Sequence, residues 1–182
     1  GQFVASGSYD TTIRIWDVTT RQGKEVAKFV VYKAIVESVS WSPCGKFLAS
    51  GSFDMMVRIW SFDLMTRQGK EVVKFEGHTH WVTSVSWSPC GRFLASVSND
   101  YTVRIWSFDA ATSQGEKVTV LKGYVDWMNS VVWSPCGQFL ASASSNKIVY
   151  IWSFNSQTRR GKEVTKFKEH TMHVNSVDWS PC

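Results

Sequence analysis

The 182-residue sequence lacks the features that mark several classes of protein. No run of apolar residues approaches the length of about 20 that a membrane-spanning helix needs. No order of charged, apolar and small residues at the start indicates a signal peptide. The net charge of +5 is modest and its Lys and Arg are spread along the chain, whereas a nucleic-acid-binding protein concentrates them on one face. We therefore expect neither a membrane nor a nucleic acid as a partner.

Cysteine is also sparse, and the spacing of its four residues argues against both of its common structural roles. A disulfide needs Cα atoms within about 7 Å, which equivalent turns of separate units are not expected to provide. A zinc site needs a cluster of ligands. We therefore expect free thiols, no metal and no cofactor, and free thiols favour a reducing, intracellular location such as the cytoplasm. The four cysteines are Cys44, Cys90, Cys136 and Cys182.

Repetition dominates the sequence instead. Two phrases recur along the chain, Trp-Ser-Pro-Cys at 41–44, 87–90, 133–136 and 179–182, and Ile-Trp at 15–16, 59–60, 105–106 and 151–152. Self-similarity at a fixed period indicates a repeat architecture. We interpret residues 1–182 as one domain of four units of about 46 residues, of which the first is two residues shorter.

Each unit has the pattern of four short strands separated by turns. In one unit the strands are predicted at 82–87, 92–98, 102–108 and 117–121, with turns at 88–91 and 99–100 and a polar loop around 114–115. Short strands with a turn about every 8–12 residues predict an all-β fold. Four strands per unit at this period predict the antiparallel blades of a β-propeller, with four blades in the chain.

Several motifs keep their order and offsets in the units. In one unit they are Gly77-His78, Trp87-Ser-Pro, Leu94-Ala-Ser-Val-Ser-Asn-Asp100 and Val103-Arg-Ile-Trp106. Together they resemble a WD-repeat blade, and the resemblance covers the whole chain. The Trp-Asp pair of that family stands only at Trp16-Asp17, and the other three copies have Trp-Ser. The resemblance implies a non-catalytic propeller scaffold for protein–protein interaction.

The resemblance also implies a buried His–Ser–Asp–Trp network in the blades. Two sets have all four residue types: His78, Ser96, Asp100 and Trp106, and His170 with Ser6, Asp10 and Trp16. Two sets are altered: Tyr32, Ser50, Asp54 and Trp60, and Tyr124, Ser142, Asn146 and Trp152. His, Ser and Asp together also suggest a hydrolase, but one active site needs one set and this set recurs. A buried Asp without its His needs another donor.

The second complete set joins the two ends of the sequence. His170 precedes a predicted first strand at 174–179, while Ser6, Asp10 and Trp16 follow no His of their own. We therefore expect a permuted arrangement in which the C-terminal strand completes the N-terminal blade. Joining two chains head to tail removes both open edges and gives an eight-bladed homodimer. A four-bladed monomer and a fragment of a larger ring are the alternatives.

One face of the propeller carries the candidate partner-binding residues. Aromatic side chains are good anchors in protein interfaces, and packing against the neighbouring blade is the other interpretation of these positions. The candidates are Tyr9, Phe53, Asn99, Ile35, Trp81, Trp127 and His173. We expect a scaffold for protein or peptide partners that also assembles with itself. The near-identity of the units equally suits an engineered or excised repeat unit without a natural ligand, and an enzyme with a site at the central channel is a further alternative.

Overall fold

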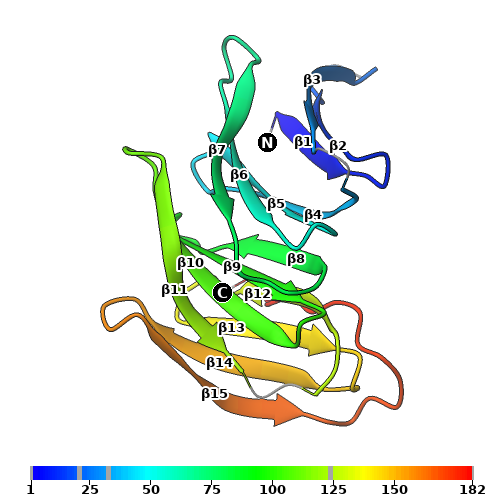
Figure 1. Ribbon diagram of the computed structural model, residues 1–182, viewed down its shortest axis with the longest axis vertical. Helices are drawn as coiled ribbons and strands as arrows, with labels where there is room; N and C mark the ends of the chain where they lie inside the picture. Colours follow the sequence, from blue (N-terminus) through cyan, green and yellow to red (C-terminus); the bar gives the residue numbers. More distant parts are fainter. Residues whose placement is uncertain (1, 20–21, 32–33, 123–124, 182) are drawn as a thin grey trace.

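The computed structural model describes residues 2–19, 22–31, 34–122 and 125–181, and the elements in these residues are β-strands (Figure 1). The strands form four antiparallel sheets, one with three strands and three with four, which confirms the all-β prediction. The sheets contain, in order, β1 (Phe3–Gly7), β2 (Thr12–Asp17) and β3 (Lys24–Val30); β4 (Val36–Trp41), β5 (Phe47–Ser52), β6 (Val57–Phe62) and β7 (Gly69–Phe75); β8 (Val82–Trp87), β9 (Phe93–Ser98), β10 (Thr102–Asp109) and β11 (Gln114–Leu121); β12 (Met128–Trp133), β13 (Phe139–Ser144), β14 (Val149–Asn155) and β15 (Arg160–Phe167). The described part of the chain offers no helix with the length and apolar character to cross a membrane.

The Ser-Pro-Cys-Gly turn sets the register between the first and second strand of a sheet. In the β8–β9 hairpin, Gly91 has a φ of +69°, a left-handed conformation that glycine adopts without steric cost. Its N–H donates to the carbonyl of Ser88 at 2.9 Å, and the hydroxyl oxygen of Ser88 accepts the N–H of Phe93 at 3.0 Å. The turn thereby holds Trp87 opposite Leu94.

A β-bulge interrupts the pairing of the last two strands in each of the four sheets. In the β10–β11 pair the register shifts between Ile105 and Trp106, and the other three sheets shift at the equivalent Ile-Trp pair. Bulges re-aim side chains, and this one lies directly at the Trp whose indole bonds to the second strand. The pairing continues beyond the bulge to Gln114, so the loop predicted at 114–115 is wrong: Phe108 pairs there with Gly115.

Successive sheets pack face to face along an arc (Figure 1). Their first strands, β4, β8 and β12, are linked by hydrogen bonds across the sheet boundaries. The N–H of Val85 donates to Ser38 Oγ at 3.1 Å, and the N–H of Val131 donates to Ser84 Oγ at 3.2 Å. Apolar side chains fill each boundary, such as Ile105 against Trp133 in the core between the third and fourth sheets. The four repeats are therefore four stacked blades.

The two ends of the arc remain open. Figure 1 shows the β1–β3 sheet at one end and the β12–β15 sheet at the other. The strand predicted at 174–179 is not formed in the described residues, because a strand needs a ladder partner and β1 lies at the far end of the arc. The segment instead lies against the fourth sheet: the N–H of Val174 donates to the carbonyl of Ser144 at the end of β13 at 3.2 Å, and Trp179 Nε1 donates to the carbonyl of Val132 in β12 at 3.2 Å. Among the described residues, the β1–β3 sheet has no strand in the position that β4, β8 and β12 occupy in the other sheets.

Candidate functional site

The third blade assembles the His–Ser–Asp–Trp set from two strands, a loop and a turn. His78 comes from the loop before β8, Ser96 from β9, Asp100 from the following turn and Trp106 from β10. Trp106 Nε1 donates to Ser96 Oγ at 2.8 Å, and Ser96 Oγ lies 2.7 Å from His78 Nε2. His78 Nδ1 lies 2.8 Å from Asp100 Oδ2. The four side chains form one continuous chain of hydrogen bonds.

One arrangement of protons satisfies every group in this network. Trp106 donates to Ser96, the hydroxyl of Ser96 donates to Nε2 of a neutral His78, and Nδ1–H of His78 donates to Asp100. A second proton on His78 would leave the hydroxyl of Ser96 without its acceptor. Burial accordingly lowers the pKa of His78 below its usual 6.5, and the hydrogen bond to Asp100 offsets only part of that effect.

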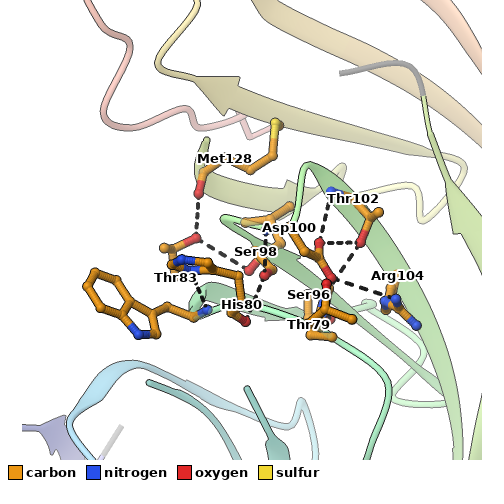
Figure 2. Close-up of polar contacts among 12 residues, drawn as sticks. Thr79, His80, Thr83, Ser96, Ser98, Asp100, Thr102, Arg104 and Met128 are labelled. Carbon is orange, nitrogen blue, oxygen red and sulfur yellow. Dashed lines mark hydrogen bonds and ion pairs between the residues drawn. The ribbon is translucent and has the colours of Figure 1, made fainter. Parts of the chain in front are cut away.

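Asp100 is the most heavily bonded residue of the set, as Figure 2 shows with Thr102 and Arg104 beside it. Besides the bond from His78, its carboxylate accepts the hydroxyl of Thr102 at 2.6 Å and the backbone N–H of Thr79 at 3.1 Å. Burial alone would raise the pKa of Asp100, but the donors, led by His78, hold it well below its usual range. The carboxylate therefore stays charged and fixes the second turn to the loop before β8.

The hydrogen bonds of this network run from Ser to His to Asp, as they do in a catalytic triad. The network differs from a catalytic triad in the exposure of its serine. The Ser96 side chain is fully buried, and its oxygen is occupied by the indole of Trp106. A nucleophile must be reachable by a substrate carbonyl, with donors placed for the developing oxyanion. This geometry favours a structural role for the network, in which each paired polar group fixes a strand or a turn.

The second blade uses an arginine where the third uses a histidine. Tyr32, the residue in the His position, lies outside the described residues. Arg58 binds the Asp54 carboxylate with both terminal nitrogens, at 2.6 and 3.1 Å, and Ser52 also bonds to it. Burial would raise the pKa of Asp54, but these bonds, those of Arg58 first, bring it below its usual value. Trp60 Nε1 still donates to Ser50 at 2.9 Å.

The fourth blade replaces both members of that ion pair. Tyr124 lies outside the described residues. Asn146 Nδ2 donates to the hydroxyl oxygen of Tyr150 at 2.8 Å, and Trp152 Nε1 donates to Ser142 at 3.2 Å. Sequence reasoning missed this position four residues after the turn acid. Aligning the units could have found it, since Arg follows each Asp and Tyr follows the Asn: Arg14, Arg58, Arg104 and Tyr150.

The N-terminal blade holds only part of its set. Trp16 Nε1 donates to Ser6 Oγ at 2.9 Å, as in the other blades. Asp10 accepts the hydroxyl and the N–H of Thr12, at 2.6 and 3.0 Å, and lies 3.6 Å from Arg14. His170 is exposed and lies beside Phe167 of β15, in the sheet at the other end of the arc. The structure therefore does not bring His170 together with Ser6, Asp10 and Trp16 within one chain.

A row of aromatic rings crosses three blades on the face that carries the second turns. Phe53 stacks on Trp81 with ring centroids 4.2 Å apart and an angle of 4° between the planes, and Tyr9 lies 6.0 Å from Phe53. His80, which the sequence reasoning missed, contacts Trp81 at 5.0 Å. Ser98 Oγ donates to the carbonyl of His80 at 2.9 Å and so holds this loop in place (Figure 2).

The remaining candidates of this face differ in exposure. Trp127 is half exposed and His173 is exposed, while Ile35 is half-buried. Asn99 is buried, because its N–H donates to the carbonyl of Trp81 and draws the turn inward, so its side chain adds little to the exposed surface. The exposed part of the face is therefore aromatic, with Tyr9, Trp81 and Trp127 as its largest members.

The cysteines lie in the turns opposite this face. Cys44, Cys90 and Cys136 are free and exposed, and each sulfur lies 3.2–3.3 Å from the hydroxyl of the Ser two residues before it. Cys182 lies outside the described residues. In the part of the chain that the structure describes, no group of three or more His, Cys, Asp or Glu side chains is arranged to hold a metal ion.

Comparison with known families agrees with this architecture. The model of the family described as WD domain, G-beta repeat matches four times, at residues 1–17, 23–61, 69–107 and 115–153. Among curated proteins, none matches the chain. The four family matches span most of the sequence, and each match after the first runs from the last strand of one sheet through the first three strands of the next. The chain therefore belongs to the WD domain, G-beta repeat family, whose members are in general non-catalytic scaffolds for protein–protein interaction.

Proposed function

We propose that this chain is a propeller scaffold whose two open ends associate head to tail, so that two copies form an eight-bladed ring. The observation that carries the proposal is the contrast between the ends of the arc and its interior. At each end, apolar side chains are exposed whose equivalents in the other blades are buried against a neighbouring blade. Burying them against a second copy is the driving force for association.

The β1–β3 sheet exposes the face that the other blades turn toward the preceding blade. Val4 is 50% exposed, whereas Leu94, which pairs with its Trp in the same way, is 0% exposed. Val18 is 47% exposed, whereas the equivalent Phe108 is 4% exposed. In the interior, Leu94 and Phe108 pack on the second blade, in the same core as Phe47. We call this end surface the leading face.

The β12–β15 sheet exposes the opposite face. Phe167 is 49% exposed, whereas the equivalent Leu121 is 3% exposed and belongs to the core between the third and fourth sheets. Ile151 is only half-buried, whereas Ile105 is fully buried. A groove of about 320 Å³ runs between these side chains and the segment 174–179, with His170 on its lining. We call this end surface the trailing face.

The two faces are complementary because they come from the same repeat. In the interior, each trailing face covers the leading face of the next blade, and a second copy can supply both missing partners. Head-to-tail contact between two copies closes the ring and covers the open edge of β1, and an open edge strand is a surface that invites uncontrolled association.

The mass of the purified chain in solution tests the proposal. Light scattering coupled to size exclusion is expected to give a single species of twice the 20.6 kDa chain mass. A two-fold ring has two interfaces between the copies, each of which we call a seam. Both interfaces must break for the dimer to dissociate, so the dimer is expected to persist on dilution into the nanomolar range. A monodisperse species at the chain mass contradicts the dimer.

The aromatic row favours a second role, the binding of a protein or peptide partner. Trp and Tyr supply large contact area at low entropic cost and are enriched at binding hot spots. Trp81 remains 42% exposed although Phe53 covers one side of its ring. We expect Trp81→Ala and Trp127→Ala each to weaken partner capture by tenfold or more. Truncation of a typical hot-spot residue costs about 2 kcal/mol of binding free energy, and about 1.4 kcal/mol corresponds to a tenfold change in Kd.

Affinity capture with the wild type, both Trp variants and Met65→Ala checks this role. Met65 is 91% exposed and lies at the opposite end of β6 from Phe53, so its truncation is the matched control. A partner retained equally by all four proteins contradicts binding at the aromatic row.

A further inference from the structure

The segment 174–179 occupies the position of a first strand even though it has no sheet. Trp179 Nε1 donates to the carbonyl of Val132 over a separation of 47 residues, as Trp87 Nε1 donates to the carbonyl of Ser40. Asn129 Nδ2 donates to the carbonyl of Val174 over a separation of 45 residues. The segment is thus docked on β12 in the register of the interior blades.

The second of these bonds has its own interior equivalent. Thr83 Oγ1 donates to the carbonyl of Met128 over the same separation of 45 residues, as Figure 2 shows. Two different donors, at both ends of the segment, therefore fix the same register. Agreement at two points excludes a slip along β12, which would break both bonds at once.

From this placement, and resting on the head-to-tail association proposed above, we infer that residues 174–179 of one copy add to β1 of a second copy in one defined antiparallel register. The interior sheets set that register. In the third blade Val85 lies opposite Ser96 and Ser86 lies opposite Ala95. The equivalent pairs across the seam are Val177 opposite Ser6 and Asp178 opposite Ala5.

The same register supplies hydrogen bonds between the segment and β4 of the second copy. In the interior, Ser38 and Ser84 accept the N–H groups of Val85 and Val131. The series advances by 46 residues, from Ser38 and Ser84 through Ser130 to Ser176 in the segment. Across the seam, the acceptor position of Ser176 meets the N–H of Val39. The carbonyl of Asp178 likewise meets Trp41 Nε1.

Trp41 Nε1 is buried and has no hydrogen-bond partner among the described residues. Trp133 Nε1, at an interior boundary, also has none, so the indole of Trp41 adds to the inference but does not carry it. The main support for the inference is the register in which residues 174–179 dock on β12.

The seam also completes the fourth polar network from two chains. His170 precedes Val177 by the same number of residues as His78 precedes Val85. Pairing Val177 with Ser6 therefore brings His170 to the Ser6–Trp16 bond and to the Asp10 carboxylate, which in one chain has Thr12 and Arg14 beside it. The site is incomplete in a single copy, and the second copy contributes the missing imidazole.

A cysteine pair placed by this register tests it. Residues directly opposite in antiparallel strands have Cα atoms about 4.5–5.5 Å apart, within the range that a disulfide bridges. In a background with all four native cysteines replaced by Ser, Asp178→Cys with Ala5→Cys is expected to give a covalent dimer on oxidation, seen on a non-reducing gel. Ser86→Cys with Ala95→Cys is the interior control, because its register is known. Asp178→Cys with Phe3→Cys, two residues out of register, is expected to cross-link at least tenfold more slowly.

The outcomes separate this inference from the association itself. A covalent dimer only for the in-register pair supports the inference. If the interior pair closes while the in-register seam pair stays reduced in a protein that is dimeric by mass, the register is overturned and the association stands. If the protein has the mass of one chain, or the seam disulfide forms within one chain, the second copy is overturned as the partner.

Discussion

Val4→Glu is expected to leave the chain folded and to abolish its assembly. Val4 is half exposed in one copy and becomes core in the proposed ring, where the equivalent Leu94 has no exposed surface. An unpaired carboxylate buried in such a core costs about 3–5 kcal/mol, which corresponds to at least a hundredfold rise in Kd at each seam. Light scattering and analytical ultracentrifugation measure the shift from dimer to monomer.

Val30→Glu is the matched control for this substitution. Val30 is in the same sheet as Val4 and is 62% exposed. Its equivalent in the next blade is Glu76, which is also exposed, so the repeat already tolerates a carboxylate there. We expect Val30→Glu to assemble like the wild type. Equal dissociation of both variants would show that charge alone disrupts the assembly, and equal retention would place Val4 outside the seam.

Ser96→Ala is expected to destabilise the fold more than any exposed substitution. Ser96 Oγ accepts the indole N–H of Trp106 and bonds to His78 Nε2, and all three side chains are buried. Removing the hydroxyl leaves a buried donor and a buried acceptor without partners, at about 1–3 kcal/mol each. We therefore expect a loss of about 2–4 kcal/mol in the free energy of unfolding, measured by urea denaturation.

Ser156→Ala provides the comparison, since Ser156 is exposed in the loop between β14 and β15. It should change the free energy of unfolding by less than about 0.5 kcal/mol. A Ser96→Ala variant within that same range would mean that the network contributes nothing to the fold. A reduced urea m-value would instead indicate that the third blade unfolds separately from the others.

The repeat period and the turn chemistry made most of the fold predictable. The strands expected at 82–87 and 92–98 coincide with β8 and β9 within one residue, because the Ser-Pro-Cys-Gly turn between them has a single low-strain solution with Gly91 in the left-handed region. The fourth strand was predicted too short. Its polar start at Gln114 has no apolar pattern, and only its pairing with Asp109 makes it part of the sheet.

The polar networks could be foreseen only in part. The resemblance to WD-repeat blades implied that His78, Ser96, Asp100 and Trp106 form one group, but the role of Arg58 as the donor to Asp54 depends on a side-chain contact between β6 and the preceding turn. In the fourth blade, Asn146 and Tyr150 stand in the positions of this Asp–Arg pair, and their side chains are again hydrogen-bonded to each other. The residue at one of these positions changes together with the residue four positions later. A comparison with a motif, made one position at a time, does not reveal such a paired change.

The sequence by itself determined the number of repeats and the strands on either side of the Ser-Pro-Cys-Gly turn, because these follow from local periodicity and turn residues. Only the tertiary structure decided which apolar side chains stay exposed and where residues 174–179 dock. Val4 and Leu94 occupy the same place in the pattern, yet one is half exposed and the other is buried. Burial depends on the neighbouring blade, and for the first and last blades that neighbour is not supplied by this chain.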